Sequence, residues 1–207
     1  SEAGLSVPPH GLLAMADHAL CYVVKRFDRT DDGGEIHKET MFQLLGATEK
    51  YAGSLEKVGK AIRGHATNVG LDMVDFFERV LFCFLTGNGD MHLKNWALLS
   101  DGRTISLAPC YDLVCSAVYM PNEEDSALTV NGRRNKLTSA DFSSLADHLG
   151  IDPKAAANSL EKLRQARGKL LELAAGSELD PGLKEKFADT IKARYGRLYG
   201  TLARSSS

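Results

Sequence analysis

Gly87-Asn-Gly-Asp-Met-His-Leu-Lys-Asn95 is the stretch that decides the fold, because of what lies on either side of it. Before it, apolar residues recur at helix spacing from about Leu71 to Thr86, and this segment is apolar round most of its circumference near its end. After it, two apolar runs at 96–100 and 104–108 flank the turn Asp101-Gly-Arg103, and an Asp-Gly pair in that setting is a strong hairpin signal. We therefore predict a buried central helix, a polar loop and a β-hairpin.

Three polar residues frame this predicted hairpin. Asp90 and Asn95 lie in the loop before its first strand, and Asp112 follows its second strand. Because antiparallel pairing brings the two open ends of a hairpin together, Asn95 and Asp112 should lie within several ångströms of each other. Mg²⁺ prefers carboxylate and amide oxygens, and phosphoryl transfer also needs a group that accepts the proton of the attacking hydroxyl. The pattern predicts Mg²⁺ on Asn95 and Asp112, with Asp90 as base, although Asp and Asn are also ordinary turn formers.

The rest of the chain predicts a short β region followed mainly by helices. A strand is expected at Ala19–Val24, after an opening that looks like the end of a helix and a connector. After the turn at 31–34 the chain is expected to be helical for about 50 residues, with Ser54 capping a helix that runs to about His65. From Ser139 onward we expect three or four helices, with breaks near 150–153 and 176–181.

Composition narrows the class of protein. The 207 residues carry a net charge of −2, with 43% hydrophobic and 25% charged residues, which is typical of a globular domain and gives no argument for nucleic acid binding. No apolar run approaches the roughly 18–20 residues that cross a bilayer, and the first residues do not read as a signal peptide, so we expect a cytoplasmic protein without a membrane partner. The four cysteines form no Cys-x-x-Cys pair, and a zinc site is not expected.

The central motif resembles that of a known family. Residues 87–95, followed by Leu107-Ala-Pro-Cys-Tyr-Asp-Leu113, are similar to the HipA-like kinases, the toxins of bacterial toxin–antitoxin systems. Val23-Val-Lys-Arg-Phe-Asp-Arg29 and Lys50-Tyr-Ala-Gly-Ser54 look like further elements of that family. The similarity runs from about Gly4 to Ala117.

The resemblance implies an ATP- and Mg²⁺-dependent serine/threonine protein kinase. It implies Asp90 as the catalytic base, Asn95 and Asp112 as magnesium ligands, Lys25, Arg26 and Phe27 as the hinge that meets the adenine, and His92 and Tyr111 as nucleotide contacts. It also implies a protein substrate such as an aminoacyl-tRNA synthetase, and a HipB-like antitoxin partner through which alone DNA would be contacted.

The chain departs from the family in one respect that matters. No G-x-G-x-x-G phosphate loop is visible, and Lys25 is followed by a hinge-like sequence, which argues against its being the strand lysine that pairs with phosphates. We therefore expect residues 1–30 to be a remnant of the small lobe with the hinge, and residues 31–207 to be a helical kinase-like catalytic lobe. The predicted fold class is α+β, predominantly α-helical: a protein-kinase-like large lobe with a catalytic hairpin and a small-lobe remnant. Alone, such a fragment is expected to bind nucleotide poorly.

Three alternatives stay open at this point. Residues 89–95 are also similar to the Gly-Asp-x-His-x-x-Asn loop of aminoglycoside and choline kinases, which phosphorylate small molecules. The missing phosphate loop favours a catalytically inactive interaction module. Leu137–Gly150 resembles a helix-turn-helix in outline, although packing within a helical lobe explains the pattern better. Arg133, Arg134 and Lys136 are read as a solvated loop, or as a contact for an antitoxin or an acidic substrate.

Overall fold

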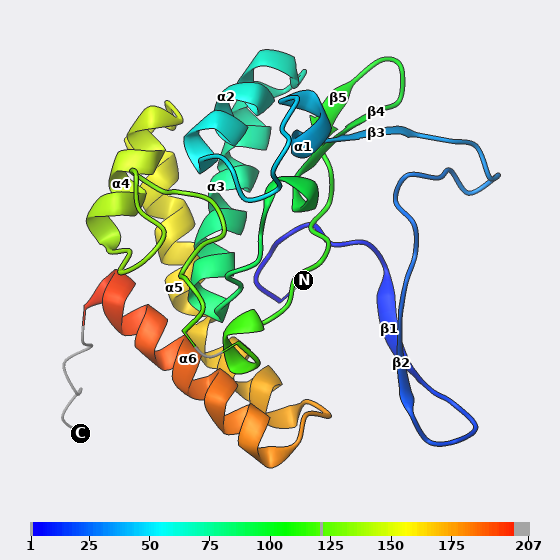
Figure 1. Cartoon of the computed structure of the whole chain (residues 1–207), viewed down its shortest axis with the longest axis vertical. Helices are drawn as coiled ribbons and strands as arrows, with labels where there is room; N and C mark the ends of the chain where they lie inside the picture. Colours follow the sequence, from blue (N-terminus) through cyan, green and yellow to red (C-terminus); the bar gives the residue numbers. More distant parts are fainter. Residues whose placement is uncertain (1, 121, 201–207) are drawn as a thin grey trace.

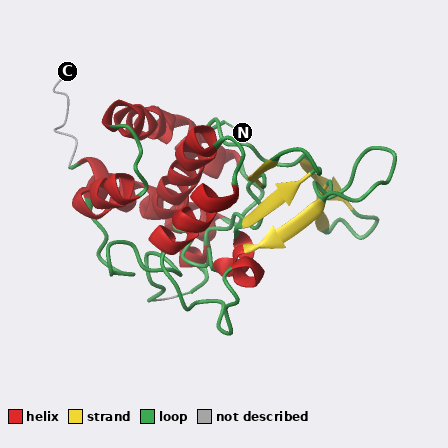
Figure 2. Cartoon of the chain, turned by 90° about the horizontal axis from the view of Figure 1, so that it is seen from above, coloured by secondary structure: helices red, strands yellow, loops and turns green. Residues whose placement is uncertain are grey.

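The computed structural model describes residues 2–120 and 122–200, and its main feature is a helical body with two small sheets (Figure 1). The larger helices are α2 (Leu55–His65), α3 (Val69–Thr86), α4 (Ser139–His148), α5 (Pro153–Gly176) and α6 (Pro181–Tyr199). Seen from above, the strands lie to one side of the helices (Figure 2). None of the helices in the described residues is both long and apolar enough to span a membrane.

Helix α3 is the buried central helix that its sequence predicts. It buries Phe76, Phe77, Leu81 and Leu85 completely, and α2, α5 and α6 pack around it. The helix ends at Gly87, which has a φ of 72° and donates its amide to Phe84. A side chain at Gly87 would come within 2.6 Å of Thr190 on α6. Glycine is therefore required here, because the chain must turn left-handedly in a space with no room for a Cβ.

A three-stranded sheet carries the predicted hairpin. Strands β4 (Ala97–Ser100) and β5 (Ile105–Leu107) pair antiparallel, which confirms the hairpin around the Asp-Gly turn. Strand β3 (His37–Thr40) pairs with the other edge of β4 and leads into the four-residue helix α1 (Met41–Leu44). The expectation of about 50 helical residues after the turn at 31–34 was therefore wrong. The segment His37-Lys-Glu-Thr40 has little strand propensity, but the free edge of β4 offers it main-chain partners.

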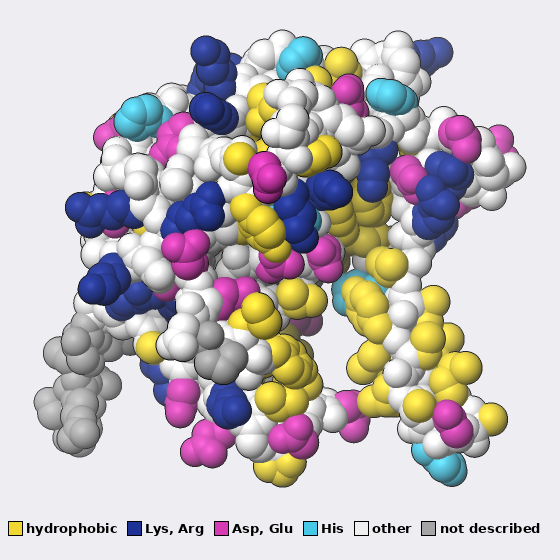
Figure 3. Space-filling model, in the orientation of Figure 1, with side chains coloured by type: hydrophobic (Ala, Val, Ile, Leu, Met, Phe, Trp, Pro, Cys, Tyr) yellow, Lys and Arg dark blue, Asp and Glu magenta, His cyan; other side chains and the backbone are white. Residues whose placement is uncertain are grey.

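The second sheet is a hairpin of β1 (His10–Ala14) and β2 (Leu20–Val24). The strand predicted at Ala19–Val24 is confirmed, but its partner β1 was missed. The connecting turn at 15–19 lacks a glycine or proline signature, and His18 takes the left-handed conformation with a φ of 66°. The hairpin stands away from the helical body (Figure 1), and all ten of its strand residues are exposed. Hydrophobic side chains cover it in the space-filling view (Figure 3).

The segment before β1 forms no helix and runs across the helical body instead. Ala3 and Leu5 are buried in the main core, and the carbonyl oxygen of Ser6 accepts a hydrogen bond of 2.8 Å from the Cys110 amide. The side chain of Lys162 on α5 donates to the carbonyl oxygen of Gly4. The start of the chain thus packs close to the polypeptide that leads to Asp112.

Residues 139–200 contain three helices with the predicted breaks. Asp152 and Asp180 cap α5 and α6, and each is followed by a proline at the first helical position. Helix α4 buries Phe142 and Leu145 in the core, and α5 packs against α3 and α6. The helix-turn-helix outline of Leu137–Gly150 therefore reflects packing within the helical body.

Candidate active site

Asp90, Asn95 and Asp112 meet at the open end of the β4–β5 hairpin. The side-chain amide of Asn95 donates to a carboxylate oxygen of Asp112 at 2.8 Å and to the main-chain oxygen of Asp90 at 3.2 Å. The predicted proximity of Asn95 and Asp112 is confirmed. Asn95 lies in the short 3₁₀ helix Leu93–Asn95, which turns the loop toward β4.

Two buried side chains hold the loop in place. Asn88 accepts a hydrogen bond from the Asp90 amide at 3.2 Å and donates to the main-chain oxygen of Asp112 at 3.4 Å, so it joins the two acidic segments. Trp96 donates from its indole nitrogen to the Met91 carbonyl at 3.2 Å and packs edge-on against Phe76. The loop is therefore tied both to Asp112 and to the central helix α3.

Helix α3 also positions the end of β5 that leads to Asp112. Asp72 accepts a hydrogen bond of 2.9 Å from the Leu107 amide, and the buried Arg79 donates to the Ala108 carbonyl while it pairs with Asp75. Asp112 itself has a φ of 55°, a left-handed conformation that costs a non-glycine residue roughly 1–2 kcal/mol. Such a conformation persists only where the surroundings over-determine it, as the contacts from Asn88, Asn95 and α3 do.

A second segment, between α1 and α2, reaches Asp90. The Tyr51 hydroxyl donates to a carboxylate oxygen of Asp90 at 2.8 Å, and its ring lies edge-on to His92 at 5.3 Å between centroids. The ammonium group of Lys50 lies 4.7 Å from the centre of the Tyr51 ring. The sequence resemblance includes Lys50 and Tyr51 but gives them no role. Tyr51 is 39 residues from Asp90 along the chain, so the sequence does not reveal their contact.

His92 lies beneath this segment as a buried, neutral imidazole. Burial lowers its pKa, and the nearby positive charge of Lys50 lowers it further. Its Nδ1 has no hydrogen-bond partner among residues 2–120 and 122–200. The edge-on contact with Tyr51 supports the interpretation of His92 as a residue that braces the loop, and it leaves a nitrogen able to meet a ligand.

A third segment, in the loop that follows Asp112, closes the side of Asp90. A side chain at Gly89 would lie 2.6 Å from the Glu123 carboxylate, and the Gly89 amide donates to Ser116 at 2.9 Å. Burial raises the pKa of Glu123, and the negative charge of Asp90 raises it further. Glu123 belongs to no sequence motif, so nothing in the sequence indicates that it lies near Asp90.

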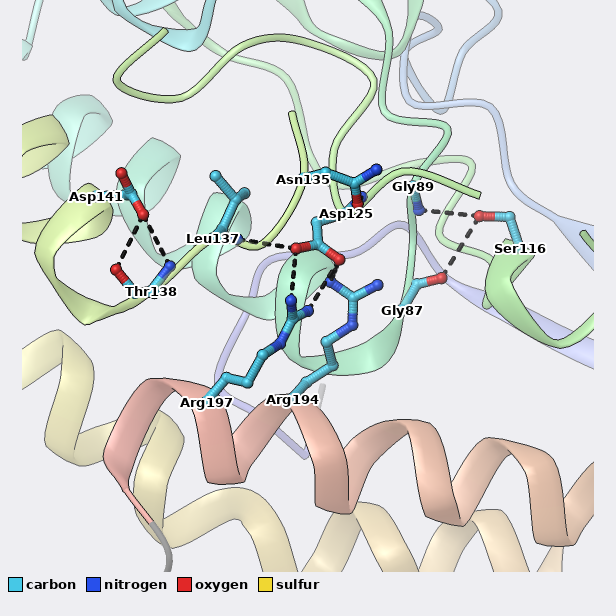
Figure 4. A network of polar contacts seen from close by, with 10 residues as sticks. All are labelled: Gly87, Gly89, Ser116, Asp125, Asn135, Leu137, Thr138, Asp141, Arg194 and Arg197. Carbon is cyan, nitrogen blue, oxygen red and sulfur yellow. Dashed lines mark hydrogen bonds and ion pairs between the residues drawn. The ribbon is translucent and has the colours of Figure 1, made fainter. Parts of the chain in front are cut away.

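Asp125 fastens this loop to the last helix, as Figure 4 shows. Its carboxylate is only 5% exposed and forms ion pairs with Arg194 and Arg197 of α6, the latter through two contacts of 2.8 Å. It also accepts a hydrogen bond of 3.0 Å from the Leu137 amide. Burial alone would raise the pKa of Asp125, but the contacts from Arg197, Leu137 and Arg194 outweigh it and hold that pKa below its ordinary value.

The predicted hinge lies next to Tyr111. The rings of Phe27 and Tyr111 are 5.3 Å apart, and the ammonium group of Lys38 lies 5.4 Å and 5.0 Å from their centres. The Tyr111 hydroxyl donates to the Lys94 carbonyl at 2.8 Å, and burial raises its pKa. Lys38 was missed, because a lysine in a weak strand carries no sequence signal.

The side chains of Lys25 and Arg26 turn to acidic neighbours. Lys25 pairs with Asp31 at 2.5 Å, and Arg26 pairs with Asp28 at 2.6 Å. Arg26 and Arg29 together lower the pKa of Asp28 to about 2, chiefly through the hydrogen bond from Arg26. The charges of both side chains are therefore engaged by neighbouring carboxylates.

The donor set fits a hard divalent cation. Within the described residues, the carbonyl oxygen of Asn95 and the second carboxylate oxygen of Asp112 accept no hydrogen bond, and both belong to groups that Mg²⁺ prefers. The Asn95–Asp112 hydrogen bond holds these two groups side by side, which is the arrangement that a shared cation needs.

Comparisons with known proteins agree with this geometry. A family model described as the HipA-like C-terminal domain matches residues 1–170. A Sinorhizobium fredii protein named "Putative kinase Y4dM" is 35% identical over 190 residues, which are 84% of this chain and 42% of that protein. A Haemophilus influenzae protein, also named a putative kinase, is 29% identical over 132 residues, 57% of this chain and 38% of its own length. The chain thus spans less than half the length of these curated relatives.

Two solved structures share the fold. HipA of Shewanella oneidensis, solved with HipB and its operator DNA, superposes with a TM-score of 0.80 at 18% identity, over 96% of this chain and 53% of that one. The Helicobacter pylori proinflammatory kinase CtkA gives a TM-score of 0.65 at 17% identity, over 94% of this chain and 75% of that one. The predicted α+β, kinase-like fold class is confirmed by these likenesses.

Proposed function

This chain belongs to the family of HipA-like C-terminal domains, and on that premise we propose that it carries the catalytic residues of an ATP-dependent serine/threonine protein kinase. Its matched relatives bear kinase names, and its fold is kinase-like. The hydrogen bond of 2.8 Å between Asn95 and Asp112, whose donor amide also contacts the main chain of Asp90, supports the proposal most directly. Two carboxylates and an amide in one network are the set that phosphoryl transfer uses.

In this proposal each residue has one task. Asp90 accepts the proton of the attacking hydroxyl, and Asn95 and Asp112 hold Mg²⁺ through their free oxygens. The hydroxyl oxygen bonds to the terminal phosphorus of ATP as the bond from that phosphorus to the bridging oxygen breaks, and ADP leaves with the bridging oxygen. Bound Mg²⁺ would neutralise charge on the phosphate oxygens.

The adenine end of the nucleotide is assigned to the hinge. The main chain of Lys25–Phe27 would meet the base, whose face would lie against the rings of Phe27 and Tyr111. Aromatic rings are suited to this role because stacking needs a flat apolar face. His92 would contact the nucleotide nearer the phosphates, since it lies two residues from Asp90 and neighbours Tyr51.

Paired substitutions test these roles in the full-length protein. Asp90→Asn should reduce phosphate transfer by at least about a hundredfold, the contribution of a positioned general base, while Mg·ADP still binds. Asp112→Asn should abolish the magnesium dependence of nucleotide binding. The control is Asp147→Asn, an exposed carboxylate on α4. Transfer at the wild-type rate by the Asp90 variant would remove the base assignment, and unchanged Mg·ATP affinity in the Asp112 variant would remove the metal assignment.

We propose further that the acceptor is a hydroxyl of a translation enzyme, such as an aminoacyl-tRNA synthetase, and that the protein is the toxin of a cytoplasmic toxin–antitoxin pair. The Shewanella neighbour was solved with HipB and DNA, which supports a HipB-like antitoxin as partner, with DNA contacted only through it. Incubation of the full-length protein with labelled ATP and cell lysate tests the substrate class. Label in one protein band supports a protein kinase, whereas label only in small metabolites favours an aminoglycoside- or choline-kinase type of enzyme. Absence of any transfer by a folded protein favours an inactive interaction module.

The division into residues 1–30, as a small-lobe remnant with the hinge, and residues 31–207, as the catalytic lobe, also remains a proposal. The exposed apolar side chains of the β1–β2 hairpin support it, because a two-stranded sheet is marginal by itself and needs further strands or a helix against it. We expect the amide hydrogens of Leu20–Val24 to exchange more slowly in the full-length protein than in residues 1–207 alone. Equal exchange rates would argue against a small lobe that covers the hairpin.

A further inference from the structure

The segment between α1 and α2 is fixed at the rim of the site by its main chain. The Lys50 carbonyl accepts a hydrogen bond of 3.0 Å from the Leu93 amide in the catalytic loop. The Tyr51 carbonyl accepts one from Arg134, which also pairs with Glu124 at 3.6 Å. Because both carbonyls are held from neighbouring loops, the fold places the Tyr51 hydroxyl on Asp90 and the Lys50 ammonium group against the Tyr51 ring.

Tyr51 leaves Asp90 with one oxygen engaged and one available. Its hydroxyl donates to Oδ1 at 2.8 Å, while the ring stays against His92. A proton acceptor must be held within hydrogen-bond reach of the substrate hydroxyl, and a carboxylate that is fixed by one oxygen presents the other in a constant direction. Tyr51 is 39% exposed, so its hydroxyl lies at the mouth of the site rather than in the core.

Lys50 supplies a positive charge that the other basic groups nearby do not. In the described residues it forms no ion pair with a carboxylate, whereas Arg134 is paired with Glu124 and His92 is kept neutral by burial. The Tyr51 hydroxyl, and then the more distant charges of Asp90 and Asp112, raise the pKa of Lys50. An ammonium group that has no carboxylate partner among the described residues therefore lies against Tyr51, whose hydroxyl contacts the proposed base.

We propose that Lys50 binds the terminal phosphate of the nucleotide, and that Tyr51 is the positioning residue that holds Asp90 toward the substrate hydroxyl. This inference rests on the proposed kinase function. ATP brings several negative charges to a site already lined by Asp90, Asp112 and Glu123, so a cation beside the transferred phosphate lowers the repulsion. Lysine is a frequent phosphate ligand because its ammonium group acts as a compact point charge with three donors.

The position of Lys50 specifies which phosphate it meets. It stands against Tyr51, whose hydroxyl touches Asp90, where the attacking hydroxyl and the terminal phosphorus must come together. Lys38, by contrast, lies over the rings of Phe27 and Tyr111, at the end assigned to adenine. Loss of Lys50 should therefore affect a triphosphate more than a diphosphate.

Calorimetric titration of the full-length protein with a non-hydrolysable Mg·ATP analogue and with Mg·ADP tests the role of Lys50. Lys50→Met should weaken binding of the analogue about tenfold, as expected for one charge-assisted contact, and change Mg·ADP affinity less than twofold. Lys50→Arg should restore most of the analogue affinity. The matched control is Lys57→Met, an exposed lysine on α2 whose affinities for both nucleotides should equal those of the wild type.

The outcomes separate this inference from the proposed function. If the wild type binds and transfers phosphate but Lys50→Met binds both nucleotides normally, or loses both equally, Lys50 is not the ligand of the terminal phosphate and the kinase proposal stands. If the wild-type protein binds neither nucleotide, the kinase proposal fails and this inference fails with it.

Tyr51→Phe gives an independent reading of the positioning role. The ring remains to pack against His92, so a merely structural role predicts unchanged kinetics. We expect kcat to fall about tenfold, a fraction of the contribution of a positioned base, while KM for ATP and the affinity for Mg·ADP stay within twofold of the wild type. An unchanged kcat would remove Tyr51 from the mechanism.

Discussion

The catalytic rim and the β1–β2 hairpin are built in opposite ways. At the rim, buried polar side chains hold the loops together: Asn88 and Asn95 bind both acidic segments, and Asp125 forms ion pairs with two arginines. On the hairpin, apolar side chains are exposed, among them Tyr22 at 63% and Leu13 at 58%. The rim is held by contacts among the described residues, whereas the hairpin carries apolar surface of the kind that marks an interaction site.

The contrast is between a region that is held by contacts within the chain and a region whose apolar side chains the described residues leave uncovered. The contacts that position the proposed base, the proposed metal ligands and the Lys50–Tyr51 pair are made between segments of the helical body and the loops on it. The hairpin is connected to that body by the segments on either side of it, and the Lys25 amide donates to the Pro9 carbonyl at its base. We therefore expect substitutions at the rim to affect stability strongly, and substitutions on the hairpin to affect association instead.

Asp125→Ala should have the largest effect. It would leave the largely buried Arg194 without its carboxylate and remove the pair with the more exposed Arg197. A largely buried charge that loses its partner costs about 3–5 kcal/mol, and most of that cost should come from Arg194. The measurement is the free energy of unfolding in urea, with Asp147→Ala on the exposed side of α4 as control. A decrease in the free energy of unfolding of less than about 1 kcal/mol would mean that the loop does not depend on the ion pairs of Asp125.

Gly89→Ala should come next, because a methyl group there meets main chain. Its Cβ would lie 2.5 Å from the carbonyl oxygen of Glu124 and 2.6 Å from the Glu123 carboxylate. Overpacking of this kind costs about 1–3 kcal/mol. Gly64→Ala on α2 is the matched control, since nothing lies within 4 Å of its added methyl group, and alanine in a helix should stabilise the chain by up to about 1 kcal/mol. Thermal unfolding of the two variants should shift in opposite directions, and a shift in the same direction would contradict the tight packing at Gly89.

Acid should weaken the ion pairs of Asp125 with Arg194 and Arg197, and so lower the free energy of unfolding. The pKa of Asp125 is lowered in the folded chain, so the ion pairs stabilise the protein fully above the unfolded pKa of about 3.9 and are lost as pH falls through the folded value. Urea unfolding between pH 6 and pH 3 should therefore show a shallower decline for Asp125→Asn than for the wild type. Parallel declines would mean that other carboxylates carry the acid sensitivity.

The smallest effect on stability is expected on the hairpin. Leu12 and Tyr22 face each other across the two strands, and both are exposed. Replacing both with serine should change the free energy of unfolding of residues 1–207 by less than about 0.5 kcal/mol per site, while it reduces self-association in sedimentation experiments. A decrease in the free energy of unfolding of more than about 2 kcal/mol would show that the hairpin packs on the helical body in solution, which would contradict the contrast between hairpin and rim.

The sequence was sufficient to predict the proximity of Asn95 and Asp112, because a single local pattern determines it. The helix, the loop and the Asp-Gly hairpin are adjacent in the chain, so strand pairing alone brought Asn95 to Asp112. It failed where pairing partners are distant: β3 takes its strand form from the edge of β4, and β1 was hidden by an unmarked turn. Tyr51, Lys38 and Glu123 reach the site from separate segments, and no spacing rule encodes such contacts. The apolar run of β2 indicated a strand but not that its side chains would be exposed.

The ion pairs between Asp125 and helix α6 determine when, during synthesis of the chain, the loop beside Asp90 can be fixed in place. Ribosomes release the N-terminal residues first, so Asp90, Asn95 and Asp112 emerge long before Arg194 and Arg197. The loop beside the base cannot acquire its clamp until those two arginines have been synthesised, near the end of the described chain. Nascent chains would therefore carry every proposed catalytic residue while the loop beside Asp90 is not yet fixed, and that loop acquires its ion pairs only after Arg197 has been synthesised.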